Sequence, residues 1–107
     1  MTPTYSFIAD LATQIPDIPS DSIISRTVYS DEVVKAVLFG FAAGQELSEH
    51  TASSPAILHF VKGEARLTLG GDSMEAVAGT WAHMSTTRST TTSTPVLVVM
   101  LLLLLKS

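Results

Sequence analysis

The stretch from residue 44 to residue 79, GQELSEHTASSPAILHFVKGEARLTLGGDSMEAVAG, decides the fold. Four of its positions stand at informative spacings: five residues separate Gly44 from His50, and fifteen separate Gly63 from Gly79. Glycine adopts positive φ values without steric cost, so such residues mark places where the backbone turns sharply. The spacing therefore predicts short extended segments joined by tight turns.

The second half of this stretch has the pattern of a β-hairpin. Apolar and polar residues alternate from residue 64 to residue 69, which is the period of a strand with one buried face. Gly70, Gly71 and Asp72 supply the positive φ values of a tight turn, and residues 74–78 return as the partner strand. Residues 56–62 are expected to form the strand before the hairpin.

Further strands are predicted on both sides. β-branched and aromatic residues dominate residues 23–29 and 33–42, and residues 81–84 are expected to be extended. Residues 96–105 are all apolar, but a membrane-spanning helix needs about 20 such residues, so this run predicts a strand that is buried on both faces. Residues 85–94, almost all Ser and Thr, are expected to be a solvated loop and strand.

The N-terminal segment has a helical pattern. Phe7, Ile8, Leu11 and Ile15 follow helical spacing, and Pro16 ends the pattern, so a short helix is predicted over residues 5–14. Many short strands indicate an all-β sandwich or barrel. We expect a single domain over residues 1–107, with residues 1–20 as a helical or irregular segment and residues 23–105 as the barrel.

Composition excludes several classes of protein. The net charge is −4 with six Lys and Arg, which argues against nucleic acid as a partner, and the chain has no cysteine for disulfides or thiolate chemistry. The N-terminus lacks the pattern of a secretory signal, so a cytoplasmic location and no membrane partner are expected. Hydrophobic residues make up 46% of the chain and charged residues 15%, and this apolar balance favours a homodimer.

The glycine and histidine frame resembles the motifs of the cupin superfamily. Gly44, His50 and Gly63 match the first cupin motif, and Gly79 matches the glycine that opens the second. The chain is similar to small single-domain cupins, also called monocupins or cupin type-2 conserved barrels. The resemblance implies a cupin-type double-stranded β-helix, or jelly-roll barrel, with a short N-terminal helix.

The resemblance also implies that the metal-binding motifs are degenerate. Cupins hold a metal with two His and a Glu from the first motif and a His from the second, and three of these four positions are here Ala52, Ala56 and Thr90. No cofactor is therefore expected. A divalent metal would depend on His50 with His83, because strand alternation points His59 away from a cavity that Ala56 faces.

Two functions follow from this reading. The first is a barrel that binds a small organic ligand without an intact metal site and without turnover. Its expected lining residues are His50, Ala52, Ala56, Leu58, Phe60, Trp81 and Thr90. The alternative is a metal-dependent cupin enzyme of the dioxygenase, isomerase or decarboxylase type, which uses His50 with non-standard ligands. For Trp81, packing in the core or at an interface is the alternative to contact with a ligand.

Overall fold

A computed structural model describes residues 4–50, 55–85 and 89–106, and their side chains except those of residues 49, 50 and 89. Within these ranges the chain forms nine strands and one 3-10 turn, η1. In chain order these elements are η1 (Leu11–Gln14), β1 (Ile23–Ser30), β2 (Val34–Phe41), β3 (Gln45–His50), β4 (Ala56–Lys62), β5 (Glu64–Leu69), β6 (Asp72–Val77), β7 (Trp81–Met84), β8 (Ser89–Thr94) and β9 (Val98–Leu105).

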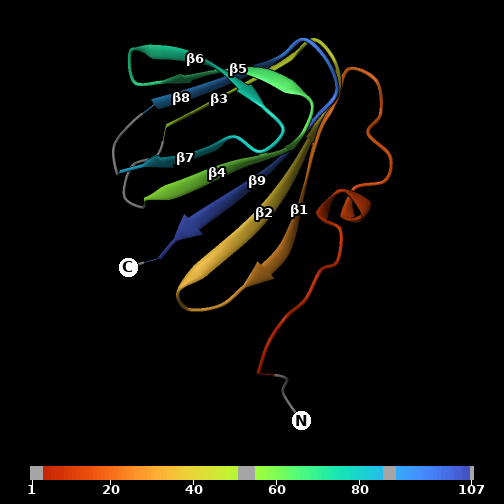
Figure 1. The fold of residues 1–107 in the computed structure, drawn as a ribbon, viewed down its shortest axis with the longest axis vertical. Helices are drawn as coiled ribbons and strands as arrows, with labels where there is room; N and C mark the ends of the chain where they lie inside the picture. Colours follow the sequence, from red (N-terminus) through yellow and green to blue (C-terminus); the bar gives the residue numbers. More distant parts are fainter. Residues whose placement is uncertain (1–3, 51–54, 86–88, 107) are drawn as a thin grey trace.

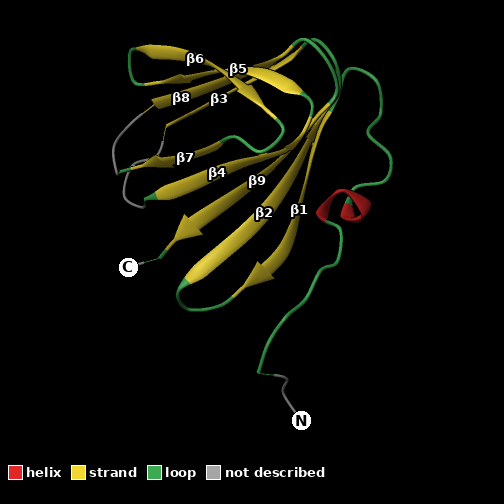
Figure 2. Cartoon of the chain, in the orientation of Figure 1, coloured by secondary structure: helices red, strands yellow, loops and turns green. Residues whose placement is uncertain are grey.

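The strands form two antiparallel sheets that face each other (Figure 1). One has five strands in the order β1-β2-β9-β4-β7, and the other has four in the order β3-β8-β5-β6. At one end of the barrel the chain changes sheet four times, where β2 leads to β3, β4 to β5, β6 to β7 and β8 to β9 (Figure 2). This arrangement confirms the predicted all-β double-stranded β-helix.

The core lies between the two sheets. Phe41, Phe60, Leu67 and Val98 are fully buried there, and each comes from a different strand. In β4 the buried and half-buried residues alternate, so Leu58 and its alternate neighbours face the interior. We call the end of the barrel where β2 leads to β3 the closed end, and the opposite end the open end. The closed end is filled by large side chains.

Strand β9 is covered on its inner face and on the first part of its outer face. Val98, Met100 and Leu102 belong to the interior core, whereas Val99 packs outside the sheet with Ile15. The N-terminal segment thus covers one part of the outer face. Its approach depends on Gly40, because a Cβ there would lie 2.7 Å from Cδ1 of Ile18.

The helix predicted over residues 5–14 is wrong in extent. Only Leu11–Gln14 is helical, as a 3-10 turn in which the Asp10 carboxylate accepts a hydrogen bond from the Ala12 amide. Apolar periodicity does not suffice for a helix, because a short isolated helix needs tertiary packing along its face. Phe7 instead lies 79% exposed.

Two polar segments form strands that the sequence pattern understates. Residues 45–50, which are not among the predicted strands, form β3 and pair with β8. Residues 89–94 form β8, and Thr90, Thr92 and Thr94 are buried rather than solvated. Threonine is β-branched and fits a pleated strand, and its hydroxyl can find a partner inside the protein.

The glycine frame has the backbone conformations that its spacing predicts. Gly44, Gly63 and Gly79 have φ values of 84°, 90° and 97°, and Gly70 has a φ of 62° in the two-residue loop between β5 and β6. Gly71 does not share this positive φ.

No helix in the described part of the chain combines the length and apolarity needed to cross a membrane.

Candidate functional site

One wall of the barrel interior carries three hydroxyl groups. Among the described residues, the only buried polar side chains are Thr90, Thr92 and Thr94, all on β8. Strand β8 lies between β3 and β5 in the four-stranded sheet, so these residues reach the middle of that wall. The interior therefore has hydrogen-bonding groups without a buried charge in its described part.

The three threonines differ in their surroundings. The Thr94 hydroxyl lies 3.1 Å from the carbonyl oxygen of Ala42 and 3.2 Å from that of Gln45, so it ties the closed end of the barrel together. Thr90 lies at the other end of β8, where its backbone is in register with Leu69 of β5. Thr94 thus has a structural role, and Thr90 lies nearest the open end.

The opposite wall is apolar, and the volume of its side chains along β4 decreases toward the open end. In β4, Phe60 fills the closed end, Leu58 lies midway, and Ala56 comes last. Ala56 is in register with Leu104 on one side and Met84 on the other. Ala56 and Thr90 therefore place small side chains toward the open end.

A hollow of about 230 Å³ lies at this end of the barrel. Two of its lining residues, Leu69 and Met84, also pack against or within the interior core. The others form its rim: Gly71, Asp72, His83 and Ser85. The hollow connects the hairpin loop between β5 and β6 with the end of β7.

The structure places four of the predicted lining residues inside the barrel. Ala56, Leu58, Phe60 and Thr90 are all buried there. Trp81 is not a lining residue: its side chain is 61% exposed, because β7 turns its alternate residues Ala82 and Met84 toward the core. The predicted alternative of interface packing stays open for Trp81.

The remaining predicted site residues are His50, the last residue of β3, and Ala52. Ala52 and the side chain of His50 lie outside the described part of the chain. The backbone of β3 is described, and in it His50 pairs with Ser89, whereas Glu49 pairs with Thr90. Contact of His50 with a ligand stays a prediction.

The described side chains do not form a metal site. Ala56 has no donor atom, and Thr90 offers a neutral hydroxyl where transition metals prefer imidazole or carboxylate. His83 is exposed and pairs with Ile57 on the outer side of β4, and His59 lies on that same outer side. No group of three His, Asp or Glu residues converges among the side chains that the structure describes.

The structure adds a residue that the sequence analysis missed. Lys35 is half-buried on the same face of β2 as Phe39 and Phe41, and it is in register with Leu104. It therefore belongs to the row that continues through Ala56. Counting back by twos puts Lys35 on the face of Phe39 and Phe41, but both faces of β2 are apolar, so the sequence alone does not show which face is interior.

The clearest electrostatic effect lies away from the barrel, in the turn between β1 and β2. The Asp31 carboxylate accepts hydrogen bonds from the Tyr29 hydroxyl at 2.6 Å and from the Val33 and Val34 amides at 2.8 and 2.9 Å. The Tyr29 hydrogen bond, with the two amides, lowers the pKa of Asp31, and the same hydrogen bond raises the pKa of Tyr29. These groups stabilise the turn and do not line the interior.

Neither a protein-family model nor a curated protein matches this chain. Solved structures do. A cupin superfamily protein from Desulfitobacterium hafniense superposes with a TM-score of 0.84 at 18% identity, covering 96% of this chain and 94% of the other. A conserved protein of unknown function from Streptococcus pyogenes gives 0.82 at 20% identity, with 98% and 91% covered. An uncharacterized Klebsiella pneumoniae protein with a double-stranded β-helix domain gives 0.81 at 17%, with 94% and 90% covered. These likenesses establish the cupin fold.

Proposed function

We propose that this cupin-fold chain binds a small, weakly polar organic molecule at the open end of its barrel, without a metal ion and without turnover. One observation carries the proposal: the buried polar groups of the described interior are threonine hydroxyls only. A ligand that entered from the hollow would meet Leu69 and Met84 first, and Ala56 and the Thr90 hydroxyl lie buried behind them. Such sites are mostly apolar with a few polar groups that orient the ligand.

The class of ligand follows from the cost of desolvation. A charged group that leaves water for an apolar interior needs a paired charge, whereas one neutral polar group needs only one hydrogen bond. Thr90 can donate or accept such a bond. An alcohol, ketone or amide with an apolar body therefore fits better than a polyanion, since half-buried Lys35 supplies one ammonium for several negative charges.

A ligand screen by NMR tests this proposal. Amide spectra of the ¹⁵N-labelled protein would be recorded with uncharged probes such as cyclohexanone and benzamide, and with citrate as a highly charged comparison. We expect saturable shifts at Leu69, Gly71 and Met84 with the uncharged probes. Thr90→Val, which keeps the volume and removes the hydroxyl, is expected to weaken benzamide binding about fivefold. Shifts caused by citrate alone would refute the proposal.

Metal analysis tests the alternative function. Protein purified without a histidine tag would be assayed for iron, manganese, nickel and zinc, together with His50→Ala as the matched variant. Stoichiometric metal that is lost in His50→Ala would overturn the metal-free proposal in favour of a metal-dependent enzyme. Metal content that does not differ between the two proteins would leave His50 without that role.

We also propose that two copies of the chain pair through the uncovered part of the five-stranded sheet. Ile57 of β4 and Leu103 of β9 are in register on its outer side, and Trp81 lies on the same side of the neighbouring strand β7. These apolar side chains lie beyond the region that the N-terminal segment covers. A second copy presents the same apolar side chains, as an isologous dimer requires.

Trp81 is the single tryptophan, so it reports directly on this face. Light scattering at micromolar concentration should give the dimer mass, and Trp81 emission should shift to longer wavelength on dilution. Leu103→Glu should give monomers. Val77→Glu is the matched control, because Val77 is an exposed apolar residue of the other sheet. A monomer mass for the unchanged protein would refute the dimer.

A further inference from the structure

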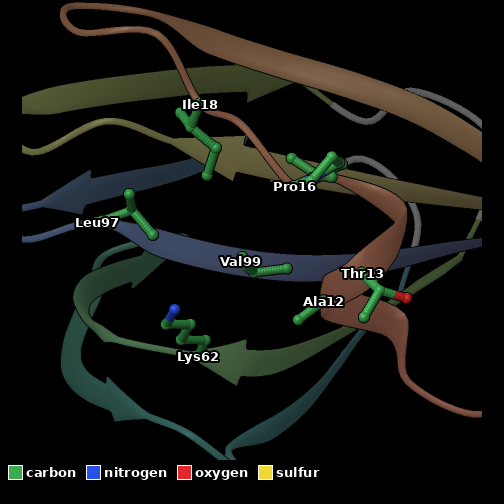
Figure 3. A pocket seen from close by; sticks show the side chains of 8 residues that line it. Ala12, Thr13, Pro16, Ile18, Lys62, Leu97 and Val99 are labelled. Atoms are coloured by element: carbon green, nitrogen blue, oxygen red, sulfur yellow. The ribbon is translucent and has the colours of Figure 1, made fainter.

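A separate cavity lies outside the barrel, beneath the N-terminal segment (Figure 3). Its volume is about 330 Å³, which is at the lower end of the range of small-molecule sites. Five lining residues belong to the N-terminal segment and three to the barrel. They are Ala12, Thr13, Ile15, Pro16 and Ile18, and Lys62, Leu97 and Val99.

The walls of this cavity are apolar and well supported. Ile15 and Val99 are buried together in the outer cluster, with Ile18 packed against them. Ile18 also rests on Gly40, where no side chain intervenes. The Thr13 hydroxyl is already engaged, since it donates to the backbone carbonyl of Asp10 at 2.7 Å.

Lys62 is the only charged residue among the eight that line the cavity. A bulge in β4 explains its position. Phe60 is in register with Met100 and Lys62 with Val99, so the ladder shifts by one residue at Val61. Regular alternation would place Lys62 on the interior side with Phe60, but the bulge brings it to the outer side with Val99.

The close-up view agrees with this register. The Lys62 side chain rises from β4, and its ammonium points toward the space bordered by Leu97 and Val99 (Figure 3). Ile18 and Pro16 lie on the opposite side of that space. A cation thus stands at one side of an otherwise apolar cavity.

We propose that this cavity binds a small organic monocarboxylate, with the carboxylate on the Lys62 ammonium and an apolar body between Ile18 and Val99. A single ammonium matches one carboxylate by a charge-assisted hydrogen bond. A phosphate or polyanion would need further donors, and the other walls supply none from charged side chains. The site is distinct from the barrel interior and does not depend on the function proposed for it.

Occupancy of this site would link the N-terminal segment to the barrel. The ligand would contact Ile15 and Pro16 on one side and Lys62 and Leu97 on the other. Because η1 is only four residues long, the segment owes its position mainly to such contacts. Binding should therefore slow hydrogen exchange of the Thr13 and Ile15 amides, which close the 3-10 turn onto Asp10 and Ala12.

The test is an NMR titration of the ¹⁵N-labelled protein with sodium hexanoate, with hexanamide as the uncharged probe of the same shape. We expect saturable shifts at Ile15, Lys62 and Val99, with a Kd for hexanoate on the order of millimolar, as is usual for so small a ligand. Lys62→Gln should weaken hexanoate about fivefold, the size of a partly exposed ion pair, and leave hexanamide unchanged. Ala12→Leu, which fills the cavity, should weaken both probes.

Lys35→Gln is the matched control, because Lys35 lies on the interior face of β2. Unchanged hexanoate binding in this variant supports the outer site. The proposal is overturned if hexanoate gives no saturable shifts up to about 50 mM, well beyond the expected Kd. It is equally overturned if Lys62→Gln binds hexanoate as well as the unchanged protein does, or if Lys35→Gln is the variant that loses binding.

Discussion

Replacing Gly63 by alanine should be the most damaging change within the glycine frame. Gly63 has a φ of 90°, and an added Cβ would clash with the carbonyl oxygen of Leu97 and lie 3.1 Å from Cα of Val98. These are backbone atoms, so no rotamer change can relieve the contact. The positive φ costs about 1–2 kcal/mol for a residue with a Cβ, and the steric overlap adds about 1–3 kcal/mol. Gly63→Ala should therefore lose roughly 2–5 kcal/mol.

Other glycines of the chain separate the two contributions. Gly44 and Gly79 have φ values of 84° and 97°, but an added Cβ meets nothing within 4 Å at either position. Their alanine variants should lose only the backbone cost of about 1–2 kcal/mol. Gly71 has neither a positive φ nor a close neighbour, so Gly71→Ala should leave stability unchanged or raise it by up to about 1 kcal/mol.

Urea unfolding at equilibrium, followed by circular dichroism and Trp81 fluorescence, measures this series. The free energy of unfolding comes from the midpoint and slope of each transition. Small domains have only about 5–15 kcal/mol in total, so a Gly63→Ala protein that is unfolded without urea also agrees with the reasoning. A Gly63→Ala protein as stable as Gly44→Ala would refute it, because the contact with Leu97 would then carry no cost.

Three further perturbations follow from specific contacts. Gly40→Ala should lose about 1–2 kcal/mol of unfolding free energy, because its Cβ would lie 2.7 Å from Cδ1 of Ile18. In a double-mutant cycle measured by thermal unfolding, adding Ile18→Ala should recover part of this loss. If the effects of the two substitutions simply add, this contact is contradicted. Tyr29→Phe should raise the lowered pKa of Asp31, seen in a ¹³C NMR titration. The stabilisation by this carboxylate is present above its unfolded-state pKa and is lost as the pH falls through its folded-state pKa, so an unchanged Asp31 pKa in Tyr29→Phe would exclude the phenol as its cause. Thr94→Val should lose about 1–2 kcal/mol in urea unfolding, since the buried hydroxyl bonds backbone carbonyls at the closed end; a variant of wild-type stability would show that water replaces it.

Local patterns in the sequence predicted most of the strands and turns. The alternation from Glu64 to Leu69 and the two glycines after it predicted a hairpin that the structure contains. The apolar run before Lys106 predicted a strand covered on both faces; β9 is covered on its inner face and, around Val99, on its outer face. These features depend on side-chain period and on φ, which each segment carries within itself.

The site was less predictable, because it depends on which face of its strand each side chain occupies. The spacing of the cupin motif predicted that Ala56 and Thr90 lie inside the barrel, and both are buried there. The sequence placed Trp81 there as well, but a four-residue strand has too short a pattern to show which face is buried. Lys35 was missed because β2 reads as uniformly apolar, and its inner face became visible only from its pairing with β9.

The sequence by itself therefore determined the class of fold, the positions of the turns and the absence of an imidazole or carboxylate at Ala56 and Thr90. These properties lie in residue type and local spacing. Only the tertiary structure decided that the threonines of β8 are buried, that Trp81 faces outward, and that a bulge in β4 brings Lys62 under the N-terminal segment. Each of these depends on the register between strands that are distant in the chain, and a shift of one residue reverses the face on which a side chain lies.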